Sequence, residues 1–112
     1  MGILSDLLAS KFGLKTYSVE SAPGFQVTAV SAPIALNNPD RVGLMIINLS
    51  ANLIYIRPAP GAAANAGIVL DANGGWRSLE WDTDWELVGS LWHGVAPAGA
   101  SNIYVLQLIG EK

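Results

Sequence analysis

The sequence predicts an all-β protein with a β-sandwich or jelly-roll-like domain, preceded by a short N-terminal helix or extended arm. Short apolar runs recur about every ten residues, separated by Gly, Pro and Asn clusters, as in sandwiches and jelly rolls. The runs are rich in β-branched and aromatic residues, which favour the pleated conformation. They are also too short for typical globular helices. These observations set the expected fold class.

The central stretch, residues 41–57, carries the strongest strand signal. Two apolar runs, residues 41–48 and 53–57, flank a polar connection, a pattern that predicts a β-hairpin with a loop of about four residues. The first run has two apolar faces, with Val42, Leu44 and Ile46 on one side and Met45, Ile47 and Leu49 on the other. An antiparallel strand with one wet face alternates with polar residues. We therefore expect this strand to be covered on both sides, by a second sheet and a loop or by another subunit.

Residues 1–40 are predicted to form an N-terminal arm, and residues 41–112 the β-sandwich domain. Residues 3–12 have helical spacing, and Gly13 is a plausible end for that helix. One face of the helix carries the apolar candidates for interaction, Ile3, Leu4, Leu7, Leu8 and Phe12. Such a helix either folds onto its own domain or docks on a partner. Residues 14–40 look extended, with candidate edge strands at 15–19 and 25–30.

Four further strands are expected after the central stretch. One strand is expected at residues 68–70. A turn is expected after it at Asn-Gly-Gly, positions 73–75, because Asn and Gly accept positive φ at little steric cost. Further strands are expected within residues 76–81, 88–95 and 102–109, and the last of these is again apolar on both faces.

Composition limits the classes of function. Only 13% of the 112 residues are charged and 51% are hydrophobic, which suggests that much of the surface is buried against partners. The net charge is −3 with six basic residues, so no nucleic-acid partner is expected. No apolar run reaches the length of a membrane span, and no signal peptide is expected. The absence of cysteine excludes disulfides and thiolate metal sites, and favours synthesis in a reducing cytoplasm.

An acidic stretch with two tryptophans is the densest polar cluster. Asp82, Asp84 and Glu86 alternate there, which is a weak calcium pattern because the glycine and distal Glu of an EF-hand are missing. A glycosidase pair is disfavoured, since side chains two residues apart rarely flank a substrate. The other interpretations are a solvated loop with inward tryptophans, or exposed Trp81 and Trp85 acting as interface anchors or sugar platforms. We expect no metal and no cofactor.

The single histidine, His93, does not define a catalytic site. Nucleophilic catalysis needs an activated Ser beside it, and a metal site needs further ligands of its kind. Its apolar surroundings in the sequence favour a hydrogen-bonded strand residue at an interface. No other catalytic motif is evident, so the chain is not expected to be an enzyme.

The order of elements resembles that of a known group of proteins. An Arg-led strand ends in Ile-Asn-Leu-Ser at residues 47–50, and a second strand contains Ile54-Tyr55-Ile56. A small-residue loop, the Asn-Gly-Gly turn, a Trp-bearing strand and a closing Ile-Tyr-Val-Leu-Gln-Leu strand follow. Over about residues 41–110 this pattern is similar to the small all-β accessory proteins of tailed-bacteriophage virions, especially capsid decoration (cement) proteins.

The resemblance implies a structural virion protein without catalytic residues. Such subunits are commonly homotrimers that sit on the capsid surface, contact the major capsid protein and tie capsomers together through a terminal arm. The alternative is a carbohydrate- or receptor-binding module of a phage fibre or tail, with Trp76, Trp81, Trp85 and Trp92 as platforms. A cupin-like enzyme is disfavoured, because its metal site uses several histidines and this chain has one.

Overall fold

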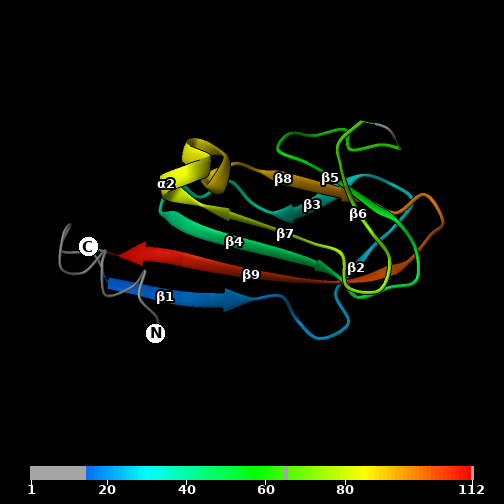
Figure 1. The fold of residues 1–112 in the computed structure, drawn as a ribbon, viewed down its shortest axis with the longest axis horizontal. Helices are drawn as coiled ribbons and strands as arrows, with labels where there is room; N and C mark the ends of the chain where they lie inside the picture. The colour runs from blue at the N-terminus through cyan, green and yellow to red at the C-terminus, as the bar shows by residue number, and fades with distance from the viewer. Residues whose placement is uncertain (1–14, 65, 112) are drawn as a thin grey trace.

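The computed structural model describes residues 15–64 and 66–111. Over these residues the chain is mostly β, with antiparallel strand pairing throughout (Figure 1). The strands are β1 (Lys15–Glu20), β2 (Gln26–Val27), β3 (Ala32–Ala35), β4 (Arg41–Asn48), β5 (Ile54–Arg57), β6 (Ile68–Leu70), β7 (Trp76–Glu80), β8 (Trp92–Val95) and β9 (Ser101–Glu111). The expected all-β class is confirmed.

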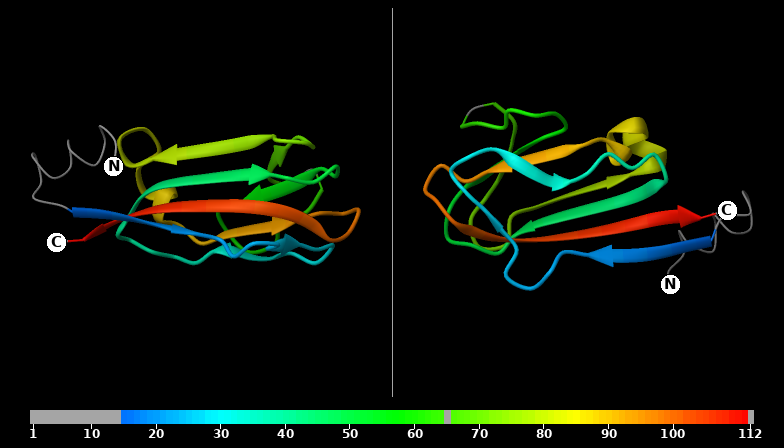
Figure 2. Two further views of the ribbon diagram at one scale, coloured as in Figure 1. Left: turned by 90° about the horizontal axis from the view of Figure 1, so that it is seen from below. Right: turned by 180° about the vertical axis from the view of Figure 1, so that it is seen from behind.

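The strands form two sheets with the winding of a jelly roll. The first sheet has the order β1-β9-β4-β7, with β2 also paired to β9, and the second has the order β3-β8-β5-β6. Leaving the short β2 aside, β1 pairs with β9, β3 with β8, β4 with β7 and β5 with β6. The chain therefore pairs first strand with last, like a long hairpin wound on itself. Figure 2 shows β1 beside β9 along one side of the molecule.

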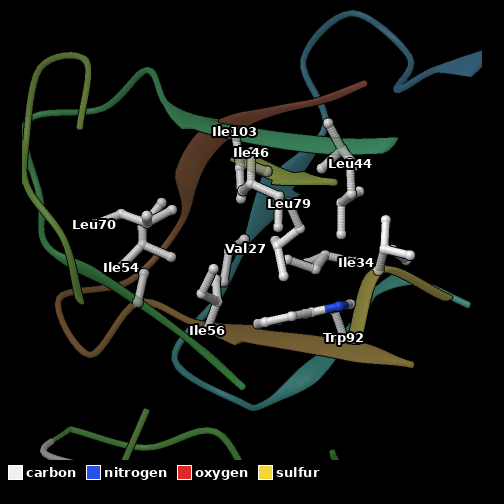
Figure 3. Packing of buried hydrophobic residues seen from close by; sticks show 14 residues of the cluster. Val27, Ile34, Leu44, Ile46, Ile54, Ile56, Leu70, Leu79, Trp92 and Ile103 are labelled. Carbon is white, nitrogen blue, oxygen red and sulfur yellow. The ribbon is translucent and has the colours of Figure 1, made fainter. Parts of the chain in front are cut away.

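The core lies between the two sheets (Figure 3). The first sheet contributes Leu44, Ile46, Ile103 and Val105, and the second contributes Ile54, Ile56, Leu70 and Trp92; all are buried. Trp92 is the largest fully buried side chain, and its indole N–H donates a 2.9 Å hydrogen bond to the Leu87 carbonyl. Burial of these side chains is the main favourable term in folding.

The prediction of a β-hairpin over residues 41–57 is wrong, because β4 and β5 lie in different sheets. Both edges of β4 are already occupied, by β7 on one side and β9 on the other. The connection instead crosses to the second sheet around Asn48, which is fully buried. Its Nδ2 donates to the carbonyls of Asn52, Leu70 and Asp71, and its Oδ1 accepts from both the N–H and the hydroxyl of Ser50. These bonds hold the corner.

The segment between residues 15 and 40 belongs to both sheets. The edge strand β1 pairs with β9 over six residues, β2 pairs with the start of β9, and β3 is an edge of the second sheet. Val27 and Ile34 are buried in the core cluster. Over its described residues, the stretch expected as an arm is therefore part of the β domain. The helix expected over residues 3–12 lies outside the described residues.

Two short helical segments replace part of the loop and strand expected over residues 81–95. These are α2 (Trp81–Asp84) and η1 (Trp85–Gly89), and β8 begins only at Trp92. A carboxylate oxygen of Asp84 accepts the N–H of Glu80 at 2.8 Å, which fixes the chain as it leaves β7. In the described part of the chain, no helix is both long enough and apolar enough to cross a bilayer.

Candidate interaction surface

The first sheet has a second apolar face, directed away from the core. Strand register places six large side chains on this face, since directly paired residues of antiparallel strands share a side. Trp76 is paired with Ile47 and Ile47 with Tyr104, and Met45 is paired with Leu106. We call the set formed by Met45, Ile47, Trp76, Tyr104, Leu106 and Leu108 the outer apolar face.

This surface is accessible in the chain as described. Trp76 is 64% exposed, and the other five side chains are partly exposed. The described strands form two sheets, so no further sheet covers this side. Polar side chains border the face, Ser78 and Glu80 on β7 and Ser18 and Glu20 on β1. A contiguous apolar patch with a polar rim is typical of protein interaction sites.

The two apolar sides of β4 face two different surroundings in the structure. Leu44 and Ile46 are buried in the core, whereas Met45 and Ile47 lie on the outer apolar face. The expectation that β4 is covered on both sides is met on the core side, whereas cover of the second side within an assembly stays a prediction.

A shallow hollow interrupts the outer apolar face at Gly43. It has a volume of about 140 Å³, and its lining includes Gly43, Met45, Leu106 and Leu108. Gly43 is paired with Leu108, and a Cβ at position 43 would lie 3.2 Å from the Leu108 Cβ. Glycine at position 43 therefore avoids a close contact with the side chain of Leu108.

Tyr104 joins the face to its rim. Its hydroxyl donates a 2.6 Å hydrogen bond to a carboxylate oxygen of Glu20. This bond raises the pKa of Tyr104, with smaller contributions from desolvation and the negative charge of Glu20. The contact fixes the orientation of the aromatic ring beside β1.

Arg41 organises one end of the sandwich, where its hydrogen-bond acceptors among the described residues are neutral oxygens. The side chain is 2% exposed, and its NH1 donates 3.0 Å hydrogen bonds to the carbonyls of Val88 and Ser90. NH2 donates to the Leu36 carbonyl, and Nε donates to Gln107. Burial lowers the pKa of Arg41. Two cavities of about 530 and 480 Å³ meet at this residue, but most of its N–H donors are already used, so its evident role is to join loops and strands.

The acidic stretch lies at the end of β7, in α2 and η1. In the described residues, no group of three His, Cys, Asp or Glu side chains is arranged to hold a metal ion. Asp84 is engaged with the N–H of Glu80 and the Thr83 hydroxyl. Trp81 packs partly buried against the core, as the interpretation with inward tryptophans expects. The structure does not describe the surroundings of the Trp85 side chain.

A serine does lie beside His93. Ser31 Oγ is 3.0 Å from Nδ1 of His93, and it also accepts a 3.0 Å hydrogen bond from the N–H of Ala62. The direction of the bond between Ser31 Oγ and His93 Nδ1 follows the tautomer of the imidazole. Among the described residues, no further bond orients the ring as a catalytic acid would. The pair joins the loop before β3 to β8 and to the loop after β5. The two residues are 62 positions apart in the sequence, so no local sequence motif predicts their contact.

The structure separates the residues that the sequence analysis singled out. The apolar candidates at positions 3, 4, 7, 8 and 12 lie outside the described residues. Of the tryptophans proposed as sugar platforms, Trp92 is in the core, whereas Trp76 presents a largely free ring. For the outer apolar face, the sequence gives one signal, which is that the strands β4 and β9 carry apolar residues on both sides.

No family model matches the chain, and no curated protein or solved structure has detectable similarity to it.

Proposed function

We propose that this chain is a non-enzymatic structural protein of a phage virion, a decoration (cement) protein that binds the capsid lattice as a homotrimer. The observation that carries the proposal is the outer apolar face. It combines aromatic, Met and branched side chains, a composition enriched at the cores of protein interfaces. Burying it against protein would contribute about 25 cal/mol for each Å² of apolar area.

The jelly-roll winding supports an assembly role, since viral capsid domains use it, but lectins and cupins use it as well. The low charged fraction also supports burial of much of the surface. The assignment to a virion rests on the order of elements over residues 41–110, and the major capsid protein is the proposed partner.

Particle reconstruction tests the proposed function. Capsids of the encoding phage are prepared with and without this chain, and the two density maps are compared. We expect regularly spaced extra density on the outer surface when the chain is present, together with greater resistance of the capsid to heat. Identical maps would refute the proposed role.

Glycan binding is the competing function, and Trp76 is the observation that favours it. An indole that is 64% exposed can stack on a sugar ring. A glycan array probed with wild type and with Trp76→Ala separates the two functions. Saturable binding that is lost in Trp76→Ala would favour a carbohydrate-binding module, whereas the decoration proposal expects no binding.

A further inference from the structure

We propose that the cavity between the edge strands β1 and β3 binds an amphiphilic carboxylate, a small molecule with one carboxylate group and a short apolar tail. The inference goes beyond the proposed structural role, because it assigns a ligand to a site away from the outer apolar face. In this site the buried guanidinium of Arg41 attracts the carboxylate, and the apolar walls of the cavity hold the tail.

The guanidinium of Arg41 lies between two cavities. Leu36 and Gln107, which accept hydrogen bonds from NH2 and Nε, line the cavity of about 480 Å³. Val88 and Ser90, which accept hydrogen bonds from NH1, line the cavity of about 530 Å³. Each cavity therefore adjoins one edge of the guanidinium.

The hydrogen bonds of Arg41 engage its donors but provide no counter-ion among the described residues. The four acceptors are neutral oxygens, and the side chain is 2% exposed. Water therefore screens this charge only weakly, and burial lowers the pKa of Arg41. An anion in an adjoining cavity would lie close to a desolvated cation, where electrostatic attraction is stronger than in water.

The charge of the lining residues favours the smaller cavity for an anion. Glu86 lines the larger cavity, where its negative charge would repel a carboxylate. None of the described residues that line the smaller cavity is acidic. Asn37 and Asn38 belong to this lining, and their side-chain amides carry N–H groups that can donate to a carboxylate.

The walls of the smaller cavity are mostly apolar. The strands β1 and β3 are end strands of the two sheets, and both contribute to the lining. The apolar and aromatic side chains of the lining include Tyr17, Val19, Ile34, Ala35, Leu36 and Ile109. Tyr17, Val19 and Leu36 are also exposed, so the described residues leave the cavity open to solvent. Its volume lies within the range of about 300–1,000 Å³ that is typical of small-molecule sites.

Calorimetric titration of the full-length chain with octanoate tests the site. Octanoate carries both the carboxylate and the tail, octanol carries the same tail without the charge, and acetate carries the charge without the tail. We expect saturable binding of one octanoate per chain. The affinities for octanol and for acetate should each be lower by about tenfold or more, because each lacks one of the two contacts.

A single substitution that supplies the counter-ion separates attraction by Arg41 from apolar contact. Gln107→Glu places a carboxylate against Nε of Arg41, so it should weaken octanoate binding by about tenfold or more and leave octanol binding unchanged. Glu86→Gln changes one charge at the larger cavity and is the matched control, which should bind octanoate like the wild type. If circular dichroism shows that Gln107→Glu is unfolded, Asn38→Asp replaces it, because it adds a negative charge to the same lining.

Three results would overturn the proposal. The first is a wild-type chain that does not bind octanoate. The second is octanol binding as tight as octanoate binding, which would show that apolar contact alone makes the site. The third is equal octanoate binding by the wild type and the folded charge variant, which would place the ligand elsewhere. None of these results changes the expectation for the particle reconstruction, so the decoration proposal is tested separately.

Discussion

Nε of Arg41 donates a 2.9 Å hydrogen bond to Oε1 of Gln107, joining the start of β4 to the middle of β9. The remaining guanidinium donors hold the carbonyls of the η1 region and of the loop after β3. One buried cation thus fixes the loops at the end of the sandwich, and its partners among the described residues are neutral oxygens.

Replacing Arg41 should destabilise the fold strongly. Arg41→Met leaves buried carbonyl oxygens without donors, and each unsatisfied group costs about 1–3 kcal/mol. We expect the free energy of unfolding to fall by about 3 kcal/mol, and Arg41→Lys to rescue little, since an ammonium lacks the planar fork. Urea unfolding measures both. Arg57→Lys, at an exposed position, is the control, and a loss below about 1 kcal/mol in Arg41→Met would contradict this role.

The corner between the two sheets should depend on the amide of Asn48. Asn48→Asp places a second acceptor oxygen against the carbonyls of Asn52, Leu70 and Asp71. We expect a loss of about 3 kcal/mol in the free energy of unfolding, from the unsatisfied acceptors and the buried charge. Asn102→Asp, on the exposed side of β9, should change it by less than about 0.5 kcal/mol. Equal losses in the two variants would show that the corner network does not matter.

Tyr104 should titrate above the ordinary tyrosine pKa of about 10. Ultraviolet absorbance of the three tyrosines, compared with Tyr104→Phe, isolates its titration. Because the folded pKa is raised, its contribution to stability is complete below the ordinary value and is lost as the pH rises through the folded value. In Glu20→Gln, the pKa of Tyr104 should fall toward the ordinary value. An unchanged titration in that variant would remove Glu20 as the cause.

Calcium should not stabilise the acidic stretch. Asp84 is engaged with the N–H of Glu80, and the described residues contain no cluster of three potential ligands. We expect the melting temperature to change by no more than a few degrees on addition of calcium or EDTA. A large shift that depends on calcium would instead make the stretch a structural metal site.

The sequence predicted the strands better than their partners. Alternation in residues 41–48 and 102–109 correctly indicated two apolar faces, because side-chain direction in a strand follows from local spacing. The polar connection after Asn48 predicts a hairpin loop, and this prediction is wrong. Whether such a corner pairs two strands or carries the chain to another sheet depends on β7 and β9, which occupy both edges of β4. That information is not local.

The polar contacts of the structure also could not be predicted from local sequence. Ser31 and His93 are 62 positions apart in the sequence. Arg41 donates hydrogen bonds to oxygens of three segments that are separate in the sequence. Burial and hydrogen bonding of such groups arise only once the sheets have packed. The alternation of apolar residues predicts that β4 and β9 have a second apolar side. The hollow at Gly43 could not be predicted, because it depends on the strand register that pairs Gly43 with Leu108.

Light scattering of the wild-type chain at micromolar concentration tests the central claim most directly. The account predicts a homotrimer, with a mass about three times the 11.8 kDa of one chain, because the outer apolar face is buried between copies. A mass of 11.8 kDa would contradict it.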